Sequence, residues 1–221
     1  MKLKKIVSLA AAALMAVSML TACGEGNSNS GDGSTVKPAE TAIVAAVNDG
    51  QSAANKVKIE FTSDAKLDAA LSSAVKAFGE NVNDNGLKTR VSDITGLLNS
   101  MADLQGYTGM AANGVAHSTN QPKDGANGAV NERVSAFVIS GVLNEDVAMQ
   151  KAAAKIDGMV ADMKATSYEK GTTKGGEKYC DYSYTGSVSM VSLEKADGQT
   201  VYCFAYTISQ TTSVKTLAPE A

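Results

Sequence analysis

The chain has 221 residues, of which 44% are hydrophobic and 19% charged, and its formal net charge at pH 7 is −3. This apolar content suffices to bury a core, which excludes wholesale disorder, and the length suits one domain with room for a small helical annex. The cations are 18 lysines and two arginines spread over an acidic chain. The sequence therefore lacks the basic patch that nucleic-acid binding requires.

The chain begins with a pattern typical of a secretion signal. Three lysines within the first five residues precede an apolar run from Ile6 to Leu20. This run is too short to span a bilayer and predicts a signal peptide that is cleaved off as residues 1–22. Its removal would leave 199 residues and, by taking away the three lysines, would move the formal charge from −3 to −6.

The signal ends in Leu20-Thr21-Ala22-Cys23, which resembles the lipobox of bacterial lipoproteins. The resemblance implies that Cys23 becomes the acylated N-terminus, with two or three chains such as palmitate holding it on the extracytoplasmic face of the cell membrane. Residues 23–38 are mostly small and polar and predict a flexible tether. The membrane, reached through this anchor, is thus one expected partner.

The first part of the folded chain, residues 39–104, is predicted to be mainly helical. Alanine-rich residues 39–50 predict a first helix. Val57, Ile59 and Phe61 then alternate with charged residues, which indicates a half-buried strand.

Two further helices are predicted to pack as a hairpin against the sheet. Ser63 or Asp64 can cap the first, and the Asn-rich run Asn81–Gly86 separates it from the second. That run resembles the start of a calcium loop, but position twelve is Ser92 instead of an acid, so we expect no metal there. The residues at helical spacing are Leu67, Leu71, Val75 and Phe78 in the first helix and Leu87, Val91, Ile94, Leu98, Met101 and Leu104 in the longer second one.

Residues Gln105–Asn131 have no hydrophobic period and predict a long loop, a feature that is usually functional. The loop contains His117, the only histidine, which is either an exposed loop residue or a ligand-binding residue. One histidine cannot form a multi-histidine zinc site, and neither HExxH nor GxSxG occurs. We therefore assign no catalytic residue, metal or cofactor from the sequence.

The stretch MAANGVAHSTN around His117 and the later hairpin YTGSVSMV…DGQTVYCFAYTI resemble the secreted CAP family. This resemblance implies an α-β-α sandwich that acts outside cells, by binding lipid or sterol or in signalling, with His117 as one ligand of its cavity. The second histidine, the paired glutamates and the tryptophans of the family pattern are missing. The resemblance thus implies a degenerate, non-catalytic relative.

Residues 132–212 are predicted to form an α/β C-terminal part. Arg133–Val142 indicates a buried strand, and Asn144 can cap the helix that follows. The inward-facing residues of that helix are Val147, Met149, Ala153, Ile156, Val160 and Met163.

A long β-hairpin is the strongest pattern in this part. Even-numbered residues are apolar or aromatic along 180–190 and again along 202–208, whereas the odd-numbered residues from Asp181 to Ser189 are polar. A three-residue loop with a left-handed Gly198 keeps the even faces together. The predicted pairs are Met190 with Phe204 and Val188 with Tyr206.

The hairpin also contains the candidate disulfide and ligand-binding residues. Export favours a bond between Cys180 and Cys203, but the predicted register places Cys203 on the other face and far along the strand, so both alternatives stay open. Tyr182, Tyr184 and Tyr206 are candidate contacts for a ligand, since tyrosine is frequent at binding surfaces, although an aromatic sheet face is more often core.

These elements predict an α+β domain over residues 39–218, with helices packed on one face of a mostly antiparallel sheet. The expected function is that of a lipid-anchored surface protein whose non-catalytic domain binds an extracellular ligand or protein. The alternative is a CAP-like protein or hydrolase that uses the loop around His117.

Overall fold

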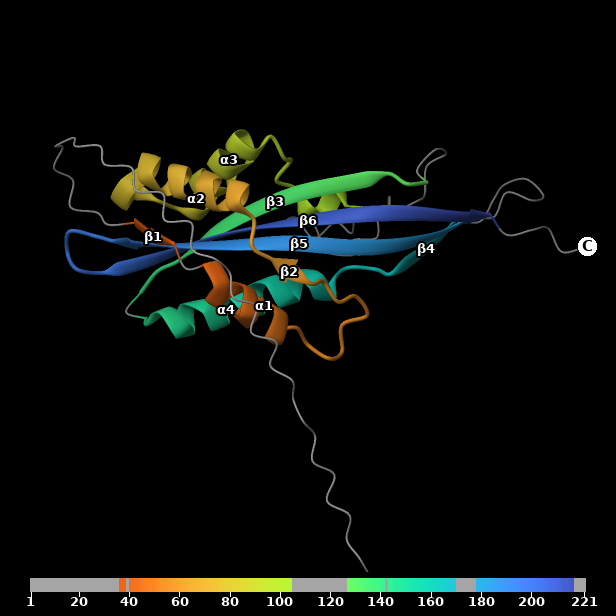
Figure 1. The fold of residues 1–221 in the computed structure, drawn as a ribbon, viewed down its shortest axis with the longest axis horizontal. Coiled ribbons are helices and arrows are strands. Elements are labelled where there is room, and N and C mark those ends of the chain that lie inside the picture. Colours follow the sequence, from red (N-terminus) through yellow and green to blue (C-terminus); the bar gives the residue numbers. More distant parts are fainter. Residues whose placement is uncertain (1–35, 39, 105–126, 142, 170–177, 217–221) are drawn as a thin grey trace, which may run out of the picture. The chain divides into compact units, whose positions relative to one another are not determined.

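The computed structural model describes residues 36–38, 40–104, 127–141, 143–169 and 178–216, which belong to one unit beginning at Gly33. The class is α+β, as predicted (Figure 1). The predicted signal peptide, Cys23 and His117 lie outside the described residues. The helices are α1 Glu40–Asp49, α2 Ala65–Phe78, α3 Asp84–Thr95 and α4 Glu145–Ala161, with short 3-10 turns at Gly79–Asn81 and Met101–Asp103. The strands are β1 Val36–Pro38, β2 Phe61–Thr62, β3 Val130–Ile139, β4 Thr166–Glu169, β5 Lys178–Glu194 and β6 Thr200–Thr216.

The long hairpin of β5 and β6 forms the centre of the sheet. β3 pairs with β6, while β1, β2 and β4 pair with β5, and of these only β2 is parallel. The predicted register is confirmed, with Met190 opposite Phe204 and Val188 opposite Tyr206. The turn sets this register, because Gly198 has a φ of 79° and donates its N–H to the Lys195 carbonyl at 2.9 Å, a conformation that favours glycine.

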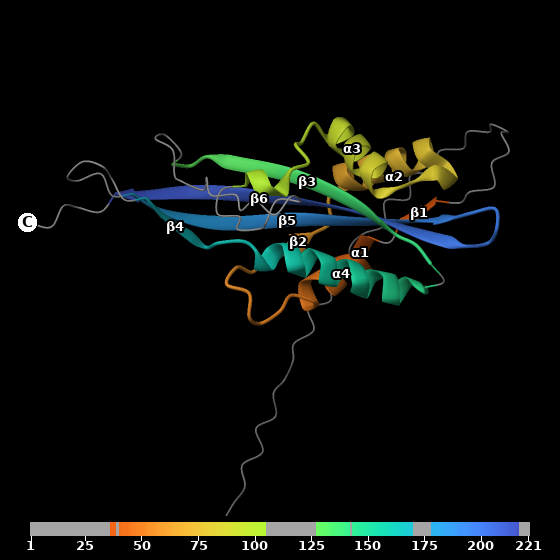
Figure 2. The same cartoon turned by 180° about the vertical axis from the view of Figure 1, so that it is seen from behind.

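Helices cover both faces of the sheet, whereas the sequence pattern predicts them on one face. The even-numbered residues of β5 and β6 pack against α1 and α4, and the odd-numbered residues near the β5–β6 turn pack against α2 and α3 (Figure 1, Figure 2). Positions 191, 193, 201, 203 and 205 are apolar, so this part of the hairpin has two apolar faces to bury. An α-β-α layer order occurs in many unrelated folds and identifies no family by itself.

The α2–α3 hairpin is shorter than predicted. Asp64 caps α2 as expected, since its carboxylate accepts the N–H groups of the second and third residues after it. α3, however, ends at Thr95, because Gly96 is left-handed with a φ of 72° and stops the helix. The prediction of one helix through Leu104 is therefore wrong, and Met101 and Leu104 pack in the core on the α1–α4 face.

The predicted strand around residues 57–61 is only partly a strand. Val57, Ile59 and Phe61 are buried in alternation, as expected. The backbone of Ile59 bonds to the side-chain amide of Gln51, at 2.6 and 3.0 Å, and that of Phe61 to the amide of Asn48, at 2.9 Å in both directions. Side chains from the end of α1 thus replace a neighbouring strand here.

Two other boundaries differ from the sequence prediction. Val36–Pro38, the last residues of the predicted tether, form strand β1, which pairs with β5. The predicted loop ends early, because Thr212 of β6 already donates its N–H to the Ala129 carbonyl at 3.0 Å and β3 starts at Val130. Asn144 caps α4, as predicted.

Candidate functional site

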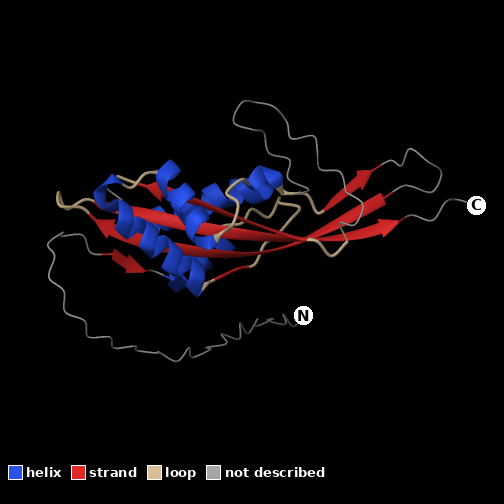
Figure 3. Cartoon of the chain, turned by 90° about the horizontal axis from the view of Figure 1, so that it is seen from above, coloured by secondary structure: helices blue, strands red, loops and turns tan. Residues whose placement is uncertain are grey.

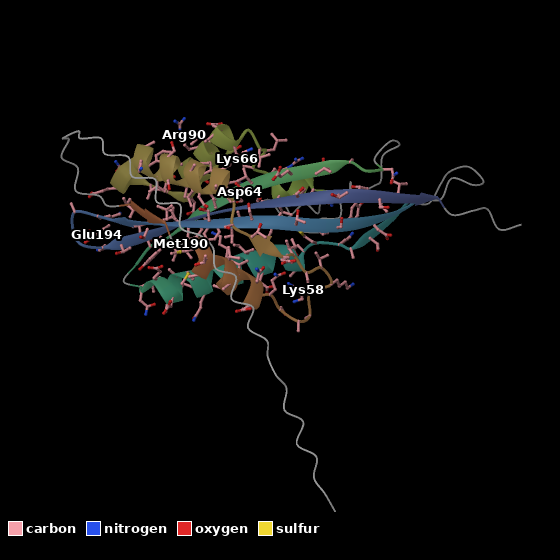
Figure 4. All side chains as sticks on the ribbon, viewed as in Figure 1. Lys58, Asp64, Lys66, Arg90, Met190 and Glu194 are labelled. Carbon is pink, nitrogen blue, oxygen red and sulfur yellow. The ribbon has the colours of Figure 1, made fainter. Side chains whose placement is uncertain are left out.

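A groove lies where the α2–α3 layer ends above the sheet. Its volume is about 560 Å³, which is within the usual range for small-molecule sites. The start of α2, the end of α3 and the strands β3 and β6 enclose it, and Figure 4 labels Asp64 and Lys66 at the start of α2. The lining residues are Asp64, Lys66, Leu67, Ala69, Ala70, Ile94, Thr95, Leu97, Glu132 and Thr207.

Thr207 lines the groove from β6, and its hydroxyl is paired with that of a residue on the neighbouring strand β5. Thr207 on β6 lies opposite Ser187 on β5, and their side-chain oxygens are 2.7 Å apart. Both side chains are buried, so each oxygen needs its partner. Since one hydroxyl donates to the other, the accepting hydroxyl keeps its own proton for a second acceptor.

The walls are mainly apolar. Leu67 and Ala70 of α2 are buried against the sheet, and Ala69 lies on the exposed side of the same turn. Ile94 and Leu97 face them from the end of α3. This arrangement offers apolar contact to a ligand on two sides.

Several polar groups of the groove are already satisfied within the protein. The Asp64 carboxylate accepts the N–H groups of Lys66 and Leu67 at 2.7 and 3.0 Å. The Thr95 hydroxyl donates to the Val91 carbonyl at 2.8 Å. Lys66 and Glu132 are exposed, as is Asp64, whose two bonds both end on Oδ1, and within the described ranges none of the three takes part in a salt bridge.

One of the exposed apolar side chains lines this groove, and a second lies on the same face of β3 as the lining residue Glu132. In the part of the chain that the structure describes, the large hydrophobic residues that are exposed are Ile94 at 41%, Leu98 at 61% and Val130 at 62%. Ile94 lines the groove, and Val130 lies two residues before the lining residue Glu132 on the same face of β3. Leu98 pairs with Arg133, so its side chain lies toward the opposite face of the sheet. Exposed apolar side chains beside a groove are typical of an interaction surface, whereas isolated ones are common everywhere.

The outer edge of β3 next to this surface is occupied by other groups. The Leu98 carbonyl accepts the Val134 N–H at 3.0 Å, and the Asp84 carboxylate accepts the Val138 N–H at 2.8 Å. These bonds occupy the edge of β3 at Val134 and Val138, where they prevent pairing with a further strand.

The predicted tyrosines do not line the groove. Tyr206 and Tyr182 are buried, and Tyr206 packs in the core edge-to-face with Phe137. Tyr184 is half-buried, donates its hydroxyl to the Lys164 carbonyl at 2.8 Å and accepts the Gln210 amide at 3.2 Å. Burial raises the pKa of Tyr184 to about 12, against the opposing effect of the bond from Gln210. These tyrosines hold the fold together, as the core interpretation predicts.

The two cysteines of the hairpin form no disulfide. Cys203 lies opposite Val191, as the predicted register requires. Cys180 is on the same strand as Val191, roughly 36 Å away at about 3.3 Å per residue, whereas a disulfide needs Cα atoms within about 7 Å. Burial, with Asp84 acting in the same direction, raises the pKa of the Cys203 thiol to about 12, so this thiol is a poor nucleophile.

The described ranges bring together no three His, Cys, Asp or Glu side chains that could hold a metal. In the predicted helix-to-helix turn, Asn83 uses its side-chain oxygen to cap α3 by accepting the Gly86 N–H at 3.0 Å. Among the same described residues, none of the helices has the length and apolar character needed to cross a membrane.

Sequence patterns did not reveal the groove residues Lys66, Ile94 and Glu132. They are charged or apolar residues at ordinary helix and strand positions. The groove forms only when four separate segments of the chain come together in the fold. The one local signal is Gly96, which ends α3 and leaves Ile94 exposed. No known family model, curated protein or solved structure matches the chain.

Proposed function

We propose that this protein is a lipid-anchored extracytoplasmic surface protein whose domain binds a ligand without transforming it. The lipobox-like Leu20–Cys23 supports the anchor, and the groove between α2, α3 and the sheet supports the binding role. The observation that carries the proposal is a groove with mainly apolar walls in which the large apolar side chain of Ile94 is exposed.

Binding accounts for the described residues better than catalysis does. The Cys203 thiol is buried beneath the α2–α3 layer, and its raised pKa keeps it protonated at neutral pH. Its environment therefore lowers its reactivity, the opposite of what a catalytic cysteine needs. The alternative that uses the loop around His117 stays a prediction, since that loop lies outside the described residues.

Filling the groove tests the binding role. On the Cys23→Ser protein, which would carry no acyl chains, we expect the apolar anion 8-anilinonaphthalene-1-sulfonate to bind with increased fluorescence. Ala69 lines the groove, so Ala69→Trp places a large ring in the space that the probe would occupy. This variant should weaken the binding of the probe at least fivefold. Ala77→Trp, at an exposed position of the same helix outside the groove, is the matched control. Equal binding by both variants, each shown to be folded by circular dichroism, would refute the groove as the site.

The anchor is tested separately in bacterial cells. We expect the wild-type chain to sediment with membranes and to incorporate labelled palmitate, and the Cys23→Ser variant to lose both properties. Cys180→Ser is the control, because its thiol is buried in the folded domain. Palmitate incorporation that survives in Cys23→Ser would contradict the proposal.

A further inference from the structure

The hairpin of α2 and α3 has a core of its own. Its buried apolar residues pack with the odd-numbered residues of β5 and β6 near the β5–β6 turn, in a cluster separate from the one that α1 and α4 form on the other face. The two helices also belong to one continuous stretch of the chain, residues 65–95. A continuous unit with its own core can separate from the sheet while the other core stays packed.

Both chain connections of this helical hairpin lie at the groove. α2 begins shortly after β2, where Thr62 pairs with Ser187, and α3 is followed by Leu98, whose carbonyl accepts the Val134 N–H at 3.0 Å. The start of α2 and the end of α3 line the groove at this same end. The connections thus provide a hinge beside the groove, and the turn between the helices is the end that can move away from the sheet.

Two carboxylates hold that opposite end. The Glu80 carboxylate, in the turn between the helices, accepts the Ala196 N–H of the β5–β6 turn at 2.7 Å. The Asp84 carboxylate accepts the Val138 N–H at 2.8 Å, and its other oxygen lies 3.7 Å from the ammonium group of Lys155 on α4. Both carboxylates belong to exposed residues. Exposed contacts of this kind are individually weak, so the bonds at this end break easily.

We propose that the α2–α3 hairpin is a lid, hinged at the groove and closed by the bonds of Glu80 and Asp84. Opening exposes the apolar residues beneath it, among them Cys203, while the core under α1 and α4 stays closed. It also widens the groove, because the start of α2 and the end of α3 are its walls. The lid therefore controls access to the groove, and this inference goes beyond the proposed binding role because it holds whichever ligand binds.

The buried thiol of Cys203 reports on opening, since N-ethylmaleimide reaches it once the lid has left the sheet. In the protein with Cys23→Ser and Cys180→Ala it is the single thiol. Its labelling rate without urea should exceed, by about tenfold or more, the rate that global unfolding allows, and should depend less steeply on urea. The control adds Val188→Cys to the Cys203→Ala form, which places a thiol under the other helical layer. That thiol should react at the rate of global unfolding.

Variants of the two carboxylates test how the lid is closed. Glu80→Ala and Asp84→Ala should each raise the labelling rate of Cys203 about fivefold, as expected for the loss of one exposed hydrogen bond. Asp93→Ala, at an exposed position of α3 that makes neither bond, should change it by less than about twofold. Equal effects of all three variants would contradict the closing role of Glu80 and Asp84.

The comparison of the two thiols tests the lid even if a carboxylate variant does not fold. Labelling of Cys203 at only the rate of global unfolding would overturn the lid, and so would an equal excess rate in the Val188→Cys protein. Neither result bears on the fluorescent probe, whose weaker binding to Ala69→Trp tests the groove as a binding site independently.

Discussion

The two halves of one sheet face differ in chemistry. On the face that α2 and α3 cover near the β5–β6 turn, which we call the covered half, the odd-numbered residues are Val191, Leu193, Val201, Cys203 and Ala205, and all are buried. Farther along the same strands, in the open half, they are Ser183, Thr185, Ser209, Thr211 and Ser213, and most are exposed. Seen from above, the strands continue beyond the helices (Figure 3).

The change along this face determines where the groove forms. The buried Ser187–Thr207 pair lies between the two halves, at the point where the helical layer ends. A face that was apolar throughout would need a longer helical layer, and one that was polar throughout would hold none. The groove thus exists because α3 stops at Gly96 while the apolar walls are still partly uncovered.

Truncating a side chain on each half should give the largest difference in stability. Leu71→Ala removes a fully buried side chain that packs α2 on the covered half. Its free energy of unfolding should fall by about 2–5 kcal/mol, since a cavity remains. Thr211→Ala, on the open half, should change it by less than about 0.5 kcal/mol. Urea unfolding followed by circular dichroism measures both, and similar losses would contradict the division into two halves.

The hydroxyl pair between the halves should show strong coupling. Thr207→Val alone leaves the buried Ser187 hydroxyl without its partner and should cost about 1–3 kcal/mol. The double variant with Ser187→Ala should cost much less than the sum of the two single changes. The same cycle at the Thr185–Ser209 pair, of which Thr185 is exposed and Ser209 half-buried, is the control and should show no coupling. Additive losses at Ser187 and Thr207 would mean that their bond contributes nothing.

Alkaline pH should weaken the covered half through Cys203. Its thiol has a pKa of about 12 in the folded protein and an ordinary value of 9.0, so above pH 9 the unfolded chain releases a proton that the folded chain keeps. Stability should therefore fall as pH rises from about 9 toward 12, by at most about 1.4 kcal/mol per pH unit from this group. Tyr184 adds a decrease of the same sign above its ordinary value of 10.0.

Cys203→Ala isolates the contribution of this thiol. Urea unfolding at pH 8, 9 and 10 should show a smaller loss of stability for the variant than for the wild type, whatever the difference between the two at pH 8. Parallel pH profiles would show that the thiol does not remain protonated in the folded state.

The same change of chemistry explains how far the sequence could predict the fold. Local patterns sufficed for the hairpin register, because Gly198 and the even-numbered apolar residues act over a few positions. They also sufficed for the caps at Asp64 and Asn144. The second helical layer does not follow from the same pattern, because the odd positions of β5 are polar up to Ser189 and become apolar only at Val191.

The candidate site was harder to predict than the fold. Its residues come from two helices and two strands, and each of them satisfies the ordinary pattern of its own element. Exposure of Ile94 and Leu98 depends on where α3 ends, and helix ends are set by single residues such as Gly96. Tyrosine is frequent at binding surfaces and therefore suggests ligand contacts along the hairpin, yet Tyr182 and Tyr206 are buried.

The smallest expected effect on stability concerns the open half. Thr185→Val with Ser209→Val replaces a facing pair of hydroxyl side chains by apolar ones of high strand propensity. The free energy of unfolding should change by less than about 0.5 kcal/mol, because none of the described helices packs there. The new apolar surface should, however, promote self-association. Sedimentation velocity should show a larger species that grows with concentration, whereas Thr185→Ala with Ser209→Ala should stay like the wild type. If the valine variant instead gained stability and stayed unassociated, some part of the chain would have to cover this half as α2 and α3 cover the other.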